Sequence, residues 1–307
     1  MYYPYLRGRQ YELIALREML EHDLLGTNII PIIEPVKASS TLISTLESFV
    51  EKKKEVIVIQ NPMAGSFSSE ISRKAPYKEK YEKQSNDANI IPAFLVEPKS
   101  ANLLGPFVEK ETKDTLLISN DIDTLPFLKS LQNSPRITAF VIPDESTFRK
   151  NISANKISLG DHFKKRVKNS LYSEITDEFF THDHLSFRED GYSGYSDFSI
   201  IGDDYTENGF APYAVAIHMV YFDMEKNLRV HHFVSDTNGD IYDTAGKFAE
   251  ALFKLVEFDE LETCNTYAIR IFRELYEGQE YPGLGTVKKL AIMHHLELIK
   301  QYFDNVN

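Results

Sequence analysis

The feature that most constrains the fold is a pattern that recurs along the chain. It reads IIPIIEPVK at residues 29–37 and IIPAFLVEPK at residues 90–99, and it returns more loosely as ITAFVIPDE at residues 137–145. A short apolar run bounded by turn residues is typical of a strand covered on both faces, as in parallel sheets flanked by helices. Proline cannot donate to a strand ladder, so Pro35 and Pro98 mark strand ends.

Eight strands of this kind are expected, most of them followed by a helical pattern. They cover residues 2–6, 29–33, 56–60, 89–96, 115–119, 137–142, 156–159 and 198–201. The helices between and after them are expected at residues 9–20, 41–54, 101–111, 123–131, 163–180, 241–257, 262–277 and 286–303. The polar stretch 61–88 is expected to hold either a helix or a mobile active-site loop.

This alternation predicts an α/β fold, a (β/α)8 TIM-barrel-like domain. It stops after the eighth strand, where the β-rich runs 213–222 and 228–234 are joined by the turn DMEKN and predict a hairpin. We therefore predict a single barrel-like domain over residues 1–307, with a β-hairpin insertion at 205–240 and C-terminal helices.

Composition limits the partners and the compartment. The net charge of −12 argues against a broad nucleic-acid or anionic-membrane surface. Cys264 is the single cysteine, which excludes an intrachain disulfide and fits a reducing compartment. The N-terminal residues lack the apolar core of a signal peptide, and no stretch has the length of a membrane span. A cytoplasmic protein is expected.

Several short motifs occur in a characteristic order. They are Tyr3-Pro4, Arg7-Gly8-Arg9, Glu12, Ala15-Leu16, Pro31, Glu34, Asp197, Gly202-Asp203-Asp204-Tyr205, Gly285-Thr286 and His294-His295. Through them the chain resembles the uncharacterised beta family proteins of bacteria, phages and mobile elements. The resemblance implies a barrel-like fold and an association with a mobile-element or phage-defence locus. It implies no established activity.

Acidic residues follow most of the expected strands. They are Glu34, Glu97, Asp121, Asp144, Asp161, Asp203 and Asp204. In a barrel these carboxylates converge on one rim, where they can bind a divalent metal such as Mg²⁺ or Mn²⁺ or act as acids and bases. We assign Asp161, Asp203 and Asp204 as metal ligands, and we assign the catalytic positions to His162, Glu97 and Glu34. The alternative is that each acid caps the helix that follows it.

Basic and amide side chains lie at the same rim. The expected ligand-binding residues are Arg7, Arg9, Lys37, Lys99, Asn61 and Asp144. Such a mixed-charge rim suits the capture of a phosphate or carboxylate group, although ordinary surface ion pairs are the competing interpretation.

Three functions are consistent with this pattern. The first is a binding protein whose rim holds a phosphorylated small molecule, a peptide or a partner protein. The second is a metal-dependent phosphodiester hydrolase that uses the acidic rim. The third is an interaction scaffold, in which the acids are scattered and each caps its own helix.

Overall fold

The computed structural model describes residues 1–99, 104–106, 108, 113–206, 212–262 and 264–306. The chain forms two compact units. The first contains residues 1–20, 27–161 and 183–198, and the second contains residues 21–26, 162–182 and 199–307. The expectation of a single domain over residues 1–307 stays a prediction.

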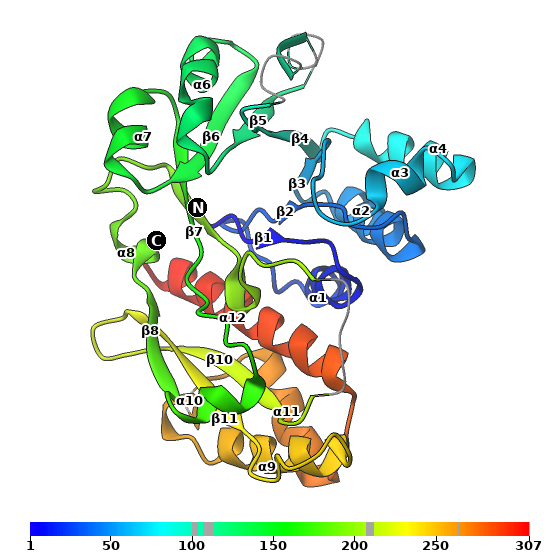
Figure 1. Ribbon diagram of the computed structural model, residues 1–307, viewed down its shortest axis with the longest axis vertical. Coiled ribbons are helices and arrows are strands. Elements are labelled where there is room, and N and C mark those ends of the chain that lie inside the picture. The colour runs from blue at the N-terminus through cyan, green and yellow to red at the C-terminus, as the bar shows by residue number, and fades with distance from the viewer. Residues whose placement is uncertain (100–103, 107, 109–112, 207–211, 263, 307) are drawn as a thin grey trace. The chain divides into compact units, whose positions relative to one another are not determined.

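The first unit is built on eight parallel strands in the order β1-β2-β3-β4-β5-β6-β7-β9 (Figure 1). Their bounds are Tyr5–Leu6, Ile32–Ile33, Val56–Ile59, Ile90–Leu95, Thr115–Ile118, Ile137–Pro143, Lys156–Gly160 and Gly194–Asp197. Tyr2 forms parallel bridges to both Ile29 and Tyr195, so it joins the first strand to the last. The predicted TIM-barrel-like fold is confirmed.

Helices follow most of these strands. Those described in the first unit are α1 (Gln10–Glu21), α2 (Ser40–Lys52), α3 (Phe67–Ile71), α4 (Ala75–Ser85), η1 (Ile122–Thr124), α6 (Leu125–Leu131), α7 (Ser146–Asn151) and α8 (Asp183–Ser186). The stretch 61–88 thus holds two helices, whereas the helix expected at 101–111 lies largely outside the described residues. Helix α2 shows how local sequence sets the bounds: the Ser39 hydroxyl accepts from the Leu42 amide at 3.2 Å, and Lys53 ends the helix in the left-handed conformation.

The barrel interior is apolar. Inward-facing side chains from successive strands pack into one cluster, which includes Ile32, Ile57, Ala93, Leu116 and Val141. Strands buried on both faces carry apolar residues at consecutive positions, which explains why their sequences read as unbroken apolar runs.

Closure of the barrel depends on close contact between the N-terminus and β9. A Cβ atom at Gly194 would lie 2.6 Å from the Tyr3 ring and 2.8 Å from the Met1 carbonyl oxygen, so glycine permits this approach. The amide of Tyr3 donates to the Tyr195 carbonyl at 2.8 Å. Nearby, the buried Tyr2 hydroxyl donates to Asp197 at 2.7 Å, and the Tyr2 ring stacks on that of Tyr195.

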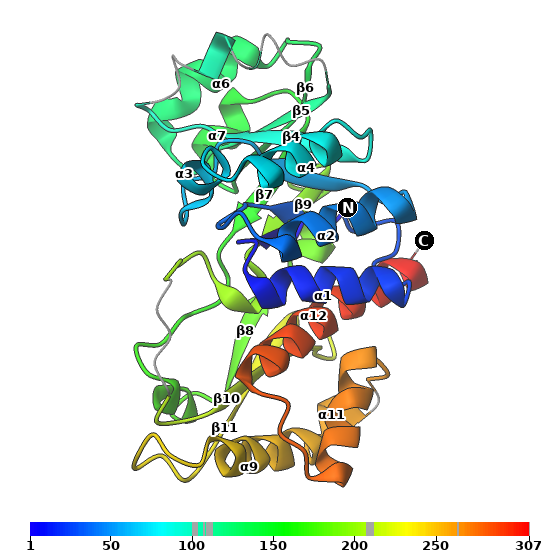
Figure 2. The ribbon, with the colours of Figure 1, turned by 90° about the vertical axis from the view of Figure 1, so that its right-hand side faces the viewer.

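The second unit is built on a three-stranded antiparallel sheet in the order β10-β11-β8. Its strands are Ala216–Phe222, Leu228–Val234 and Asp177–Thr181. The other elements are η2 (Asn169–Ser173), η3 (Ser199–Ile201), α9 (Thr244–Val256), α10 (Asp259–Glu262), α11 (Tyr267–Gly278) and α12 (Leu284–Val306). Helices α9 and α12 pack on the hairpin strands, and α11 packs on both of these helices (Figure 2). The predicted hairpin and C-terminal helices are confirmed.

Two element predictions are wrong. The helix expected at 163–180 is replaced by η2 and β8, because β8 pairs with β11 and this pairing overrides the local helical pattern. The strand expected at 198–201 is η3, and the eighth barrel strand is β9. Ser199 has a positive φ of 51°, which ends the extended backbone there, while β9 carries glycine, serine and aspartate in place of an apolar run.

Helix α12 buries polar side chains as well as apolar ones. His294 is fully buried; its Nδ1 lies 2.8 Å from the Thr266 hydroxyl, and its Nε2 lies 2.7 Å from the Val220 carbonyl oxygen. Burial lowers the pKa of His294 to about 4, so the ring is neutral at pH 7. None of the helices in the described part of the chain combines the length and the apolar character that a membrane span needs.

The buried His294 predicts an acid-sensitive second unit. Below the ordinary pKa of 6.5 the unfolded chain binds a proton that the folded chain excludes until about pH 4. We expect the free energy of unfolding to fall by on the order of 3 kcal/mol across this pH range because of this one group. Urea unfolding at pH 7 and pH 4 measures it. The His294→Gln variant should lose this part of the fall in unfolding free energy, whereas the control His182→Gln, at an exposed site, should keep it. Equal pH dependence of the unfolding free energy in wild type and both variants would show that His294 is not its source.

Candidate functional site

Glu34, a predicted catalytic residue, is fully buried at the end of β2. Its Oε1 accepts from the backbone amides of Met63 and Ala64 at 2.8 and 2.9 Å, and its Oε2 accepts from the Tyr5 hydroxyl at 2.8 Å and from Arg7. The Arg7 guanidinium also lies 5.4 Å from the ring centre of Phe198. The carboxylate is thus surrounded by donors of its own unit, and this arrangement fixes the loop after β3 to the ends of β1 and β2.

Four other predicted barrel-rim residues of the first unit each contact a different partner. Asn61 bonds the backbone of Leu95 in both directions at 2.8 Å, which is a structural contact. Asp121 accepts from the Asp123 amide at 2.9 Å and caps η1, as the capping interpretation expects. Asp144 pairs with Arg149 at 2.7 Å, and Arg9 lies 4.0 Å from Glu12. The remaining predicted rim residues of the first unit are exposed, namely Lys37, Glu97, Lys99 and Asp161.

The predicted metal ligands are divided between the units. Asp161 belongs to the first unit, whereas Asp203 and Asp204 belong to the second, as does His162, which was predicted as a catalytic residue. Asp204 lies 3.7 Å from Lys165. Within the described residues, no group of three or more His, Cys, Asp and Glu side chains is arranged to hold a metal ion. The metal assignment and the hydrolase hypothesis that rests on it stay predictions.

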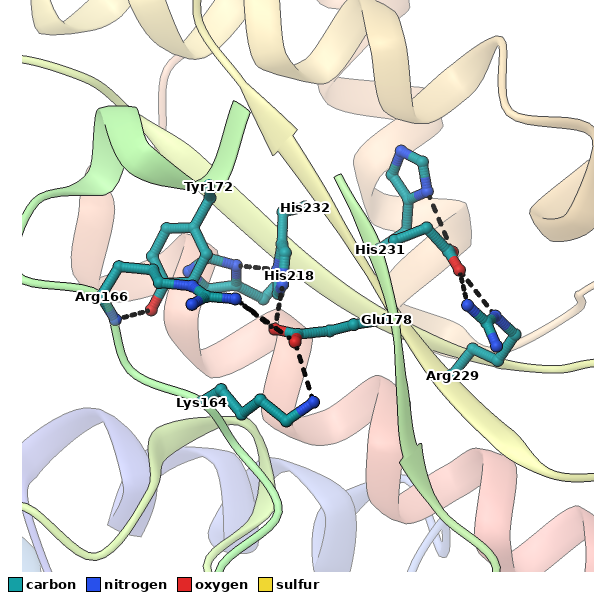
Figure 3. A network of polar contacts seen from close by, with 9 residues as sticks. Lys164, Arg166, Tyr172, Glu178, His218, Arg229, His231 and His232 are labelled. Atoms are coloured by element: carbon teal, nitrogen blue, oxygen red, sulfur yellow. Dashed lines mark hydrogen bonds and ion pairs between the residues drawn. The ribbon is translucent and has the colours of Figure 1, made fainter. Parts of the chain in front are cut away.

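The second unit carries a polar network on one face of its sheet (Figure 3). Glu178 on β8 is 9% exposed, and its Oε2 accepts from Lys164 at 3.1 Å. Arg166 lies 3.4 Å from both carboxylate oxygens, and His232 Nε2 lies 3.2 Å from Oε1. Burial acts to raise the pKa of Glu178, but the hydrogen bonds from Lys164 and His232 outweigh it and hold that pKa below its ordinary value. Glu178 is therefore a carboxylate at neutral pH.

Two histidines extend this network across the sheet. His218 on β10 is the register partner of His232 on β11, and their Nδ1 atoms lie 2.8 Å apart. The Tyr172 ring lies 4.6 Å from both imidazoles, and the Phe163 ring lies 5.0 Å from His218. Burial, then His232 and Lys288, hold the pKa of His218 well below 6.5. Burial likewise lowers the pKa of His232, against the opposing effect of Glu178.

A cavity of about 270 Å³ adjoins this network in the second unit. Its polar and aromatic lining comes from the segment before β8, from β10 and from the first turns of α12. These side chains are Phe163, Lys165, Arg166, Asn169, Tyr172, His218 and Lys288. Three of the lining side chains, those of Lys165, Arg166 and Lys288, are cationic, in a chain whose net charge is −12. Arg166 Nε is buried and finds no acceptor among the residues described, so the lining also holds a donor suited to an anion.

The opposite face of the sheet carries a separate network, also drawn in Figure 3. Asp177 accepts from Arg229 Nε at 2.6 Å and from the Tyr221 hydroxyl at 2.7 Å, and it lies 3.3 Å from His231 Nδ1. His231 and His232 therefore face opposite sides of β11, because adjacent strand residues alternate. None of the Asp177 partners lines the cavity.

Sequence reasoning missed the cavity residues because they come from three distant segments. Its helix prediction at 163–180 placed Lys164, Arg166 and Glu178 on a wrong element. The usable signal was the pairing of the predicted hairpin strands: with DMEKN as the turn, His218 and His232 fall opposite each other.

Comparisons of the chain with protein-family models, with curated proteins and with solved structures found no match. The resemblance to the beta family proteins stays a prediction.

The bonding of Glu34 predicts a structural role that the exposed Glu97 does not share. Glu34→Ala removes a fully buried carboxylate from Arg7 and from the Tyr5 hydroxyl and takes the acceptor from the Met63 and Ala64 amides, so it should destabilise the first unit by about 3 kcal/mol. Glu97→Ala, the matched control, should change stability by less than about 0.5 kcal/mol. Urea unfolding measures both, and a Glu34→Ala variant as stable as the wild type would show that the contacts are unimportant.

Proposed function

We propose that the protein binds a small phosphorylated molecule in the cavity of the second unit. The observation that carries the proposal is the lining itself: Lys165, Arg166 and Lys288 surround a cavity of about 270 Å³ beside a neutral histidine. This site differs from the barrel rim on which the sequence pattern concentrates, and its residues are already close to one another.

The charge of the lining selects the ligand class. Guanidinium and ammonium groups bind phosphate through short, charge-assisted hydrogen bonds. Two of these cations have described ionic partners at the edge of the cavity: Arg166 shares Glu178 with Lys164, and Lys165 is 3.7 Å from the exposed Asp204. A local positive lining in an acidic protein attracts an anion to one place.

The rest of the lining favours an organic phosphate over a bare ion. Phe163 and Tyr172 supply aromatic surface, Ile200 and Ile217 supply aliphatic surface, and Asn169 supplies an amide. Ligand sites of this kind combine an apolar wall with a few convergent polar groups. The volume is at the small end of the range for such sites, which favours a ligand the size of a sugar phosphate.

The wider setting is part of the same proposal. The resemblance to the beta family supports a role in a mobile-element or phage-defence locus, with the bound phosphate compound as the molecule sensed or held there. The single Cys264 supports a cytoplasmic location, where thiols stay reduced.

Removing one cation from the cavity should weaken phosphate binding. We expect Lys288→Gln to lower the affinity for inorganic phosphate and for ribose 5-phosphate about tenfold, because a hydrogen bond to a charged group contributes about 1.5 kcal/mol or more. Isothermal titration calorimetry measures this, with uncharged ribose as the ligand control.

The matched control variant is Lys289→Gln. Lys289 is the next residue of the same helix and does not line the cavity, so the charge change is identical. Its affinity should stay within about twofold of the wild type. Failure of wild-type protein to bind either phosphate compound, or equal losses in the two variants, would overturn the proposal.

A further inference from the structure

The hydrogen bonds of Glu178, His232 and His218 fix where each proton lies. An ionised carboxylate only accepts hydrogen bonds, so His232 must carry its proton on Nε2, which lies 3.2 Å from Glu178. A neutral imidazole has one N–H, so His232 Nδ1 is an acceptor. The 2.8 Å contact then requires His218 to donate from its own Nδ1.

This assignment of protons determines the state of His218 Nε2, the nitrogen farthest from Glu178 in the series of hydrogen bonds. With its proton on Nδ1, neutral His218 has an unprotonated Nε2, because the hydrogen bond to His232 among the described residues uses Nδ1. His218 lines the cavity together with Lys165, Arg166 and Lys288. A lone pair is therefore held beside the cationic groups to which we assign the phosphate.

We propose that His218 Nε2 is a general base in this cavity and that it activates a water molecule to hydrolyse a bound phosphodiester. Glu178 and His232 are positioning residues, since they set the tautomer of His218 and do not line the cavity. This inference rests on the proposed binding of phosphate compounds.

The step is balanced in atoms and charge. An O–H bond of water breaks and its proton passes to His218 Nε2, while the water oxygen forms a bond to phosphorus. The bond from phosphorus to the leaving oxygen breaks, and that oxygen keeps the electron pair. Lys165, Arg166 and Lys288 stabilise the charge that develops on the phosphoryl oxygens. The proton on His218 returns to solvent after release of the products.

The position of the base favours a diester over a terminal phosphate. Transfer of a terminal phosphoryl group passes through a loose transition state with little bonding to the nucleophile, so a base contributes little there. A general base contributes most where the attacking oxygen must lose its proton in the transition state. The relay resembles the arrangement in which a carboxylate orients an imidazole for proton abstraction, lengthened here by one histidine.

Hydrolysis of bis(p-nitrophenyl) phosphate in the presence of EDTA tests the proposal and separates it from metal-dependent cleavage. His218→Gln should lower kcat at least about 100-fold, the contribution typical of a general base. Its affinity for inorganic phosphate should stay within about threefold of the wild type. His231→Gln on the opposite sheet face is the matched control and should retain wild-type kcat.

A pH profile distinguishes the positioning role of Glu178 from a merely structural one. The titratable and charged groups around His218 are His232 on β11, Tyr172 on η2 and the cavity-lining Lys165, Arg166 and Lys288, with Glu178 paired to Arg166 and His232. Because the pKa of His218 lies well below 6.5, wild-type kcat should be level from pH 8 to pH 6.5 and fall at lower pH. Glu178→Gln removes the charge that favours protonation of His232, the direct partner of His218, so the acidic limb of kcat should move to lower pH. The kcat limb is the readout, because Glu178 also pairs with Arg166 of the cavity lining and its loss can alter KM.

The outcomes separate the two proposals. If phosphate binds but wild-type protein releases no p-nitrophenolate above the buffer rate, the catalytic inference is overturned and binding stands. If hydrolysis is equally fast in His218→Gln and in wild type, His218 is not the base. If phosphate compounds do not bind at all, the proposed function itself fails.

Discussion

A buried carboxylate must be matched by donors, and this constraint organises both units of the protein. Glu34 meets it with side chains and backbone amides, and Glu178 meets it with side chains alone. Around Glu34 the donors are two backbone amides, a tyrosine hydroxyl and Arg7, and these contacts fix the loop after β3 to the ends of β1 and β2. Around Glu178 one donor is His232, and His232 itself contacts His218. The second carboxylate is thereby connected to a cavity, whereas the first serves the fold.

The barrel was predictable because strands buried on both faces read as short apolar runs bounded by turn residues. Runs such as VIVI at β3 and TLLI at β5 are apolar at every position. The failures occur where that signal is absent. Strand β9 reads GYSD and depends on Gly194 for close contact with the N-terminus, and β8 reads DEFFT and is held by pairing with β11. Both strands are specified by tertiary contacts, which a local pattern does not contain.

The candidate site was less predictable for a related reason. Glu34 was singled out because it follows a predicted strand. That position alone does not distinguish a catalytic acid from a carboxylate that accepts hydrogen bonds from nearby backbone amides. The cavity combines the segment before β8, strand β10 and the start of α12, and only the folded chain shows that Lys165, His218 and Lys288 are neighbours. The hairpin strands that carry His218 and His232 were predicted, so that part of the network lies on elements that the sequence indicates.

The central claim is that Glu178 fixes the tautomers of His232 and His218. Nitrogen-15 NMR of histidine-labelled protein, recorded with and without inorganic phosphate, tests this most directly. The account predicts that at pH 7.5 His232 is protonated on Nε2 and His218 on Nδ1, with phosphate shifting the His218 signals. Protonation of His218 on Nε2 would contradict the account. So would His218 chemical shifts that stay unchanged when the protein binds phosphate.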